Sequence, residues 1–231
     1  MVFGINRDQL TKTKWWSTGD CWYRPFTSDQ VAKEFLAFIH QNGSYRDRRG
    51  DHSCETDPSF LQIIPYGFFI DSSGQILTYT RGGTKYKENR LTGKISIGLG
   101  GHVDDTDADV LAALIREISE EADIVTAGQV VRPDPDINYH QWLKQYLVIK
   151  PLGLLMDNRS DGAGSVGQVH IGLICQLIPQ LPTVQLQVQL GAEGVSQQSI
   201  GLTELKQMIS SGGVTPETWT QLLIDLVLPK L

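Results

Sequence analysis

The sequence predicts an α/β protein with a mixed β-sheet, on the basis of three observations. Several segments rich in β-branched and aromatic residues read as strands. A few amphipathic segments with capping residues, interleaved with these strands and following them, read as helices. The 231 residues, 40% of them hydrophobic and 20% charged, are enough for one large domain, or one domain with a small appendage.

Composition excludes several classes of protein. A formal net charge of -6 and a pI near 5.3 argue against a nucleic-acid-binding surface, and the basic run Arg46–Gly50 is best read as a solvated loop. Cys21, Cys54 and Cys175 are widely separated and form no CxxC pair, which predicts reduced thiols without a disulfide framework or a zinc site. No signal peptide and no membrane-spanning run is recognised, so we expect a soluble cytoplasmic protein.

The N-terminal quarter contains one clear helix. Residues 1–25 are polar with scattered tryptophans and are treated as an N-terminal extension of a domain that covers residues 26–231. A helix is predicted at about residues 28–42, because Thr27 and Gln30 have capping-box spacing and Gly43 ends the pattern. Its apolar stripe is Val31, Phe35, Phe38 and Ile39.

The remaining elements follow in order. Residues 60–70 and 75–81 read as two strands joined by the tight turn DSSG, and residues 94–101 as a strand that runs into two glycines. A helix is predicted at residues 108–122. Further strands are predicted at 145–156, 167–178 and 184–190, and helices at 202–210 and 215–228. Thr215 is the expected N-cap of the last helix, with Pro216 at its first position and a core stripe of Trp219, Leu222, Leu223, Leu226 and Val227.

The helix predicted at residues 108–122 concentrates acidic side chains. At about 100° per residue, one face carries Leu111, Leu114, Ile115, Ile118 and Ala122. Glu117, Glu120 and Glu121 fall on a neighbouring arc roughly 100° wide, beside the buried edge rather than opposite it. Several carboxylates that point into one space, with room for water, are the ligands that Mg²⁺ prefers.

The segment GGHVDDTDADVLAALIREISEEADI, residues 100–124, resembles the Nudix box, whose pattern is G-x5-E-x7-R-E-U-x-E-E-x-G-U with U aliphatic. The right half matches at Arg116, Glu117, Ile118, Glu120, Glu121 and Ile124. The segments QIIPYGFFID, GKISIGLGGHV and VGQVHIGL resemble one bacterial branch of the family, and the likeness covers residues 26–231.

This resemblance implies a Nudix-type α/β/α sandwich around a mixed β-sheet, and a hydrolase that cleaves a phosphoanhydride bond in a nucleoside diphosphate linked to another group. The implied cofactor is Mg²⁺ or Mn²⁺, held by Glu117, Glu120, Glu121 and the carbonyl of Gly100. The implied catalytic residues are Glu120, Glu121 and Arg116, with Arg116 orienting a neighbouring carboxylate.

Two positions depart from the family pattern. From Gly101 to Arg116 the chain is one residue longer, so the first glutamate of the box falls on Asp107 or Ala108. The last glycine of the box is Asp123, which we expect at a helix C-terminus that requires positive φ, since Asp tolerates this conformation better than most residues.

Substrate contacts are predicted at Gly101, His102 and Arg81, with Glu193 as a further carboxylate from a late loop. His170, among apolar residues of a strand, is read as a core histidine, and Lys85, Lys87 and Arg90 as surface charges. The expected partner is a small-molecule nucleotide derivative, with no membrane contact, and a homodimer is compatible with the sequence. The alternative is a non-catalytic Nudix-fold module that binds or senses a nucleotide derivative.

Overall fold

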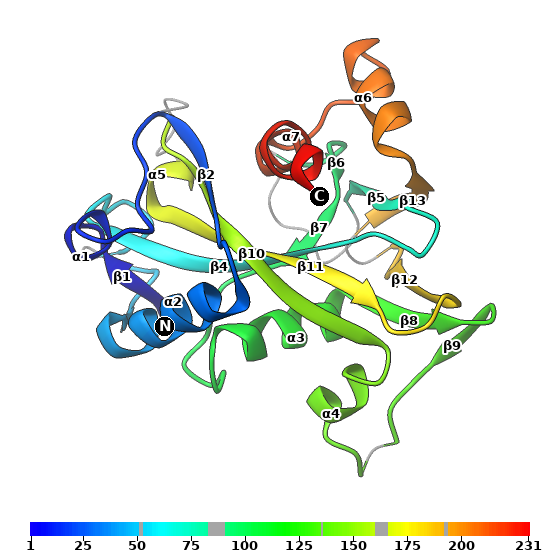
Figure 1. Ribbon diagram of the computed structural model, residues 1–231, viewed down its shortest axis with the longest axis horizontal. Coiled ribbons are helices and arrows are strands. Elements are labelled where there is room, and N and C mark those ends of the chain that lie inside the picture. Colours follow the sequence, from blue (N-terminus) through cyan, green and yellow to red (C-terminus); the bar gives the residue numbers. More distant parts are fainter. Residues whose placement is uncertain (51–52, 83–90, 135, 160–165, 192–193) are drawn as a thin grey trace. The chain divides into compact units, whose positions relative to one another are not determined.

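The computed structural model describes residues 1–50, 53–82, 91–134, 136–159, 166–191 and 194–231 (Figure 1). The strands are β1 (Val2–Asn6), β2 (Cys21–Pro25), β3 (Ser44–Arg46), β4 (Phe60–Phe69), β5 (Ile76–Arg81), β6 (Ile95–Ser96), β7 (Gly98–Gly100), β8 (Ala122–Thr126), β9 (Gln129–Val131), β10 (Leu147–Asp157), β11 (His170–Pro179), β12 (Val184–Val188) and β13 (Gly194–Ile200). The α-helices are α1 (Arg7–Thr11), α2 (Asp29–Asn42), α3 (Val110–Glu121), α4 (Tyr139–Leu143), α5 (Val166–Val169), α6 (Leu202–Ser210) and α7 (Thr218–Leu222). A π-helical turn (Leu223–Val227) and a 3₁₀ turn (Leu228–Lys230) close the chain.

The strands form three sheets, and the chain divides into two compact units. The largest sheet has the order β2-β10-β11-β4-β1-β3, with β7 also paired to β4, and the two others have the orders β12-β8-β9 and β13-β5-β6. Unit 1 comprises Met1–Tyr66, Gly100–Leu114 and Pro151–Cys175. Unit 2 comprises Gly67–Leu99, Ile115–Lys150 and Gln176–Leu231.

The predicted N-terminal extension supplies strands to unit 1. β1 pairs antiparallel with both β3 and β4, and β2 pairs antiparallel with the second half of β10, beside which it runs in Figure 1. Trp15 lies between these strands in the sequence and packs its ring against Phe35 and Phe38 of α2, with centroids 5.5 and 5.0 Å apart. Residues 1–25 therefore contribute to the sheet and to the packing of α2.

The predicted helix at 28–42 is confirmed as α2, but its cap differs from the prediction. Ser28 rather than Thr27 is the N-cap, because its hydroxyl accepts the N–H of Val31. The buried stripe is Ala32, Phe35 and Ile39. Gly43 follows the helix as predicted, in an extended conformation.

The turn between β4 and β5 in unit 2 matches the predicted tight turn. The Asp71 carboxylate accepts the N–H groups of Ser73 and Gln75, and Gly74 takes a φ of 79°. The flanking strands pair through the single bridge Ile70↔Ile76 and then enter different sheets. The strand predicted at 94–101 is present as the two short strands β6 and β7.

The acidic helix is confirmed as α3, whose N-cap is Asp109. The Asp109 carboxylate accepts the N–H of Ala112 at 2.8 Å. The expected left-handed conformation of Asp123 is wrong: β8 begins directly after Glu121, and Asp123 pairs with Gln187 of β12. No positive φ is needed there, because the chain passes from helix into strand without a turn.

The strands predicted at 145–156, 167–178 and 184–190 correspond to β10, β11 and β12, and the helix predicted at 202–210 is α6. The start of the last helix was predicted wrongly. The Thr215 carbonyl accepts the N–H of Ile95, and Pro216 bridges Ile95, so this segment is extended beside β6 and the helix begins at Thr218. The side chains buried in the C-terminal turns are Leu222, Leu223, Ile224, Val227 and Leu228, without Trp219 and Leu226.

The cores of the two units consist of aliphatic and aromatic side chains, as the pattern predicts. In unit 1 the most buried are Ile5, Leu10, Phe35, Phe60, Leu61, Leu154 and Ile171; in unit 2 they are Phe68, Tyr79, Ile97, Ile118, Leu177, Val184 and Leu223. Cys21, Cys54 and Cys175 form no disulfide. No helix in the described part of the chain is long and apolar enough to cross a membrane.

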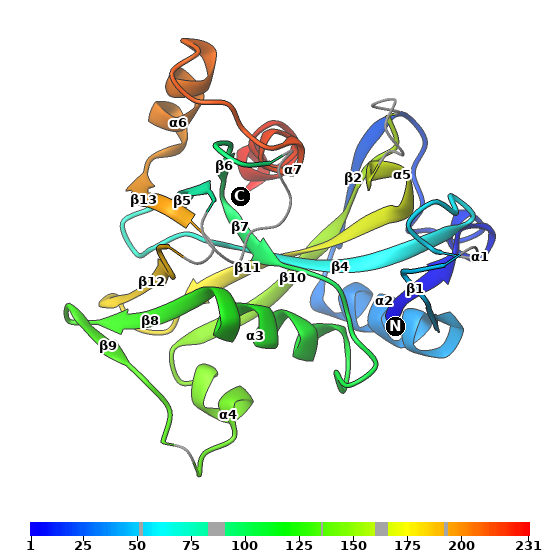
Figure 2. The ribbon, with the colours of Figure 1, turned by 180° about the vertical axis from the view of Figure 1, so that it is seen from behind.

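The hairpin of β8 and β9, visible in Figure 2, was not predicted from the sequence. Thr126 pairs with Gln129, so the loop consists of Ala127 and Gly128 alone, with φ values of 50° and 77°. Two consecutive positive φ values define a type I′ turn, for which Asn-Gly is the favoured sequence. Alanine is the first loop residue here, so the turn carries a local conformational cost.

We therefore expect Ala127→Asn to raise the free energy of unfolding by about 0.5–1 kcal/mol, because Asn tolerates the left-handed region and Ala127 is exposed. Urea unfolding followed by circular dichroism measures this change. Ala127→Val is the matched control and should lower the stability, since a β-branched residue is strained at positive φ. An Asn variant that is less stable than the parent would contradict the turn assignment.

Candidate active site

Glu117, Glu120 and Glu121 lie in the last turn of α3, within unit 2. Ile115 and Ile118 of the same turn are buried, which fixes the side of the helix that faces the core. The orientation of the helix determines how exposed each glutamate is. The Glu117 side chain is 15% exposed and that of Glu120 is 56% exposed, whereas Glu121 is buried. Glu117 and Glu121 thus lie at the edge of the buried face, whereas Glu120, which was predicted to lie beside them, is largely exposed to solvent.

Arg116 contacts two of these carboxylates. Its Nη1 lies 2.9 Å from Oε1 of Glu117 and 3.4 Å from Oε1 of Glu120. One guanidinium therefore holds two neighbouring acidic side chains and offsets part of their mutual repulsion. The orienting role expected for Arg116 stays a prediction.

Glu121 lies near a buried tyrosine. The Tyr79 hydroxyl donates to the carbonyl of Gly98 at 2.9 Å. Burial raises the pKa of Tyr79 above its ordinary value, Arg81 opposes this shift, and the carboxylates of Glu121 and Glu217 add to it. Tyr79 is accordingly a neutral hydrogen-bond donor at physiological pH, enclosed by charged groups.

The three glutamates fit a divalent cation by chemistry and register, but their side chains are not gathered into a metal site here. An all-carboxylate donor set with one exposed member suits Mg²⁺ or Mn²⁺, which keep several water ligands. Within the described ranges, no three His, Cys, Asp or Glu side chains are close enough together to hold a metal ion. Binding at α3 therefore requires Glu117 and Glu120 to turn from Arg116 toward the ion.

Gly100, in unit 1, occupies a position that only glycine can take. Its φ is 148°, and a Cβ atom there would lie 2.1 Å from the carbonyl oxygen of Pro65. The backbone of Gly100 therefore lies close against the backbone of strand β4, which contains Pro65. The role of the Gly100 carbonyl as a metal ligand, and of Gly101 as a substrate contact, stays a prediction.

The upstream glutamate of the box has no direct counterpart. The Asp107 carboxylate accepts the N–H of Asp104 at 2.8 Å, which closes the loop before α3. Ala108 has no carboxylate. The extra residue of this loop is therefore accommodated by a turn that Asp107 stabilises.

His102 and His170, both in unit 1, form a pair that the sequence did not reveal. Their Nε2 atoms lie 3.2 Å apart and their ring centroids 5.3 Å apart. His170 is buried, as expected for a core histidine, and one imidazole donates to the other. The predicted substrate contact of His102 is untested by this arrangement.

Arg81 forms a buried ion pair with Glu217, a residue that sequence reasoning missed. Arg81 Nε lies 2.8 Å from Oε2 of Glu217, and the two side chains are only 11% and 5% exposed. The Ser96 hydroxyl donates to Oε1 of Glu217 at 2.6 Å. The clue that the sequence offered to this ion pair was Glu217 itself, a lone acidic residue just before an apolar helix.

The predicted contact of Arg81 with substrate stays a prediction. The predicted residues Glu193, Lys85, Lys87 and Arg90 lie outside the described residues.

The fold belongs to a known class. Tm1382, a protein provisionally assigned as a Nudix hydrolase, has a structure that matches 100% of this chain and 99% of its own, with a TM-score of 0.64 and 22% sequence identity. DR0079 from Deinococcus radiodurans matches 80% of this chain and 91% of its own, with a TM-score of 0.48 and 13% identity. The match to Tm1382 shows that this chain has the fold of that protein, and the predicted α/β class with a mixed sheet is confirmed.

No protein-family model matches the sequence. The chain is 32% identical to Protein YmaB of Bacillus subtilis (strain 168) over 206 residues, which cover 87% of this chain and 86% of that protein. It belongs to the family of YmaB.

The Arg81–Glu217 pair generates a stability prediction. Arg81→Met or Glu217→Gln alone should lower the free energy of unfolding by about 3–5 kcal/mol, because each leaves its partner buried without its counter-charge. The double variant should lose much less than the sum of the two. Urea unfolding of the four proteins gives the coupling energy as a double-mutant cycle.

The exposed pair Arg48–Glu55, with side chains 47% and 32% exposed, is the matched control, and its coupling should stay below about 1 kcal/mol. Additive effects at Arg81 and Glu217 would show that the two charges do not support each other in the folded protein.

Proposed function

We propose that the protein is a metal-dependent hydrolase that cleaves a phosphoanhydride bond in a nucleoside diphosphate linked to another group. The observation that carries this proposal is the last turn of α3, where Glu117 and Glu121 lie at the edge of the buried face, Glu120 is more than half exposed, and Arg116 contacts Glu117 and Glu120. The resemblance of this turn to the Nudix box and the match of the whole chain to the Nudix fold support it.

The charges of this turn favour a divalent cation. Three carboxylates against one guanidinium leave two uncompensated negative charges within six residues, Arg116 to Glu121. Partial burial strengthens their repulsion, since water screens them less. An ion of charge +2 balances the turn, and the same ion neutralises phosphate oxygens and activates water.

The chain's own residues would then have separate tasks. Glu117 and Glu121, the less exposed pair, would hold the ion from the edge of the core. Glu120, more than half exposed, is the carboxylate best placed to reach solvent and accept a proton from water. Arg116 contacts Glu117 and Glu120 and offsets part of the repulsion between them.

The second candidate is a Nudix-fold module that binds a nucleotide derivative without cleaving it. The loop before α3 favours this candidate, because Asp107 is engaged by the backbone of Asp104 and Ala108 offers no oxygen ligand. Both candidates bind a nucleotide derivative, but only the hydrolase cleaves it.

The test is a panel of nucleotide sugars, dinucleotides and (d)NTPs incubated with Mg²⁺ or Mn²⁺, with the nucleoside monophosphate product separated by ion-exchange chromatography as the readout. We expect turnover of a nucleoside diphosphate derivative that EDTA abolishes. Glu120→Gln should reduce kcat by about two orders of magnitude or more while leaving the circular dichroism spectrum unchanged, because the exchange is isosteric. Glu204→Gln, at an exposed position of α6, is the control with the same change of charge and should retain parent activity.

Hydrolysis at the parent rate in EDTA, or by Glu120→Gln, would contradict the mechanism. Calorimetric binding of a panel compound without any turnover would establish the non-catalytic module instead.

A further inference from the structure

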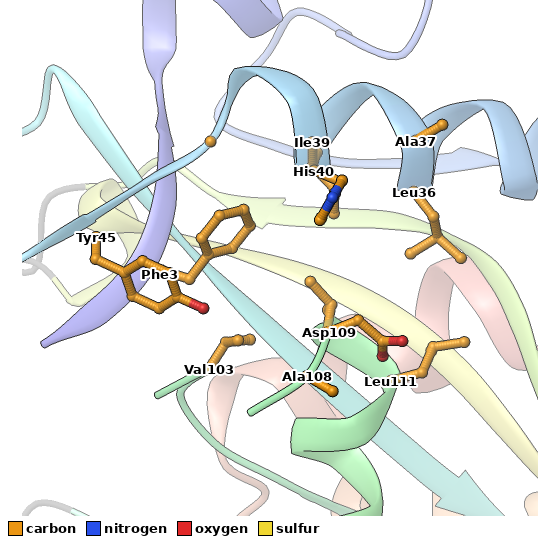
Figure 3. A pocket seen from close by; sticks show the side chains of 12 residues that line it. Phe3, Leu36, Ala37, Ile39, His40, Tyr45, Val103, Ala108, Asp109 and Leu111 are labelled. Atoms are coloured by element: carbon orange, nitrogen blue, oxygen red, sulfur yellow. The ribbon is translucent and has the colours of Figure 1, made fainter. Parts of the chain in front are cut away.

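Unit 1 contains a hollow of about 500 Å³, whose walls come from four segments (Figure 3). α2 contributes Leu36, Ala37, Ile39 and His40, β1 and β3 contribute Phe3 and Tyr45, and the remaining wall is Val103 with residues 108–111. This volume lies within the range of about 300–1,000 Å³ that small-molecule sites occupy. All of these residues lie in unit 1, and none carries a role in the proposed metal chemistry.

The larger part of the hollow is apolar and includes two aromatic rings. Phe3 and Tyr45 lie on one wall with centroids 5.2 Å apart and planes inclined at 56° (Figure 3). Leu36 and Leu111 contribute aliphatic surface that the protein's own chain leaves partly uncovered. Contact with an apolar group would remove this surface from water, which is favourable.

One acidic side chain lines the hollow and is held in place. Asp109 lines the hollow, and its carboxylate accepts the N–H of Ala112 at 2.8 Å. Burial raises the pKa of Tyr45, and Asp107, Asp105 and Asp104, which are not among the residues that line the hollow, raise it further.

Among the described residues that line the hollow, His40 of α2 is the one with a basic side chain and Asp109 the one with an acidic side chain. Arg48 and Arg49 lie with Asp104 around a separate, smaller hollow.

We propose that this hollow binds a small organic cation, an ammonium group carried on an apolar body that contains a ring. The body would pack between the Phe3 and Tyr45 rings and the aliphatic wall, and the ammonium would lie near the Asp109 carboxylate, on the side of Leu111 (Figure 3). An aromatic face and a fixed carboxylate both attract a cation, and they repel an anion of the same shape. The proposal is independent of the hydrolase activity.

Three probes of matched shape test it: 2-phenylethylammonium, 2-phenylethanol and 3-phenylpropionate, each titrated into the full chain and followed by amide ¹H–¹⁵N NMR. We expect saturable shifts at the amides of Ala37, His40, Tyr45 and Leu111 with the ammonium. The alcohol should bind at least about tenfold more weakly, the equivalent of 1.4 kcal/mol, and the carboxylate should cause no saturable shift.

Two variants locate the site. Ala37→Trp fills the hollow from an exposed helix position and should abolish the shifts. Asp109→Asn keeps an N-cap acceptor but removes the charge, and should weaken the ammonium about tenfold while leaving the alcohol unchanged. Glu204→Gln makes the same change of charge outside the hollow and should have no effect.

Absence of saturable shifts with the ammonium, equal affinity for the carboxylate, or shifts that persist in Ala37→Trp would each overturn the proposal. If sedimentation shows a dimer of the parent that Ala37→Trp dissociates, the hollow is covered by a second copy of the chain and the proposal is also wrong. Should Ala37→Trp not fold, the pattern of shifts in the parent and the selective loss in Asp109→Asn still decide the question.

Discussion

The position of the candidate site depends on the packing of one helix turn. Ile115 and Ile118 are almost completely buried, and this burial fixes the rotation of α3 about its axis. The register then leaves Glu117 and Glu121 at the edge of the core and Glu120 in solvent. Three like charges so close together repel one another. Arg116 supplies one positive charge, and the proposed cation supplies the rest.

A second charged group in unit 2 also lies near Tyr79. Glu217 stands just before α7 and binds Arg81 of β5 and Ser96 of β6, so a single carboxylate ties the C-terminal helix to two strands. Tyr79 lies close enough to both Glu217 and Glu121 for their charges to affect its pKa. Removal of Arg81 or Glu217 is thus expected to affect the fold first, and any loss of activity in such variants has to be separated from a loss of stability.

Elements that show a local pattern of apolar residues can be predicted from the sequence. Elements that depend on pairing with distant parts of the chain cannot. α2 and α3 follow from apolar stripes and caps, and the central strands follow from β-branched runs. β1 and β2 were missed because their identity as strands depends on partners distant in the sequence, β4 and β10. The β8–β9 hairpin was missed because Ala-Gly is an uncommon type I′ turn. Thr215 and Pro216 have the sequence of a helix start, but backbone hydrogen bonds with Ile95 hold this segment extended.

At the candidate site, helical spacing predicts which glutamates share an arc of α3. The pairings of Arg81 with Glu217 and of His102 with His170 depend on tertiary contacts that no spacing encodes.

The central claim is that the carboxylates of the last turn of α3 bind a divalent cation, and Mn²⁺ tests it most directly. Electron paramagnetic resonance distinguishes free from bound Mn²⁺ and counts the bound ions without any substrate. The account predicts bound Mn²⁺ that Mg²⁺ displaces in the parent and in Glu204→Gln, and loss of this binding in Glu117→Gln/Glu121→Gln. Undiminished, Mg²⁺-displaceable binding in that double variant would show that the acidic turn is a solvated helix face and that the metal, if the protein uses one, binds elsewhere.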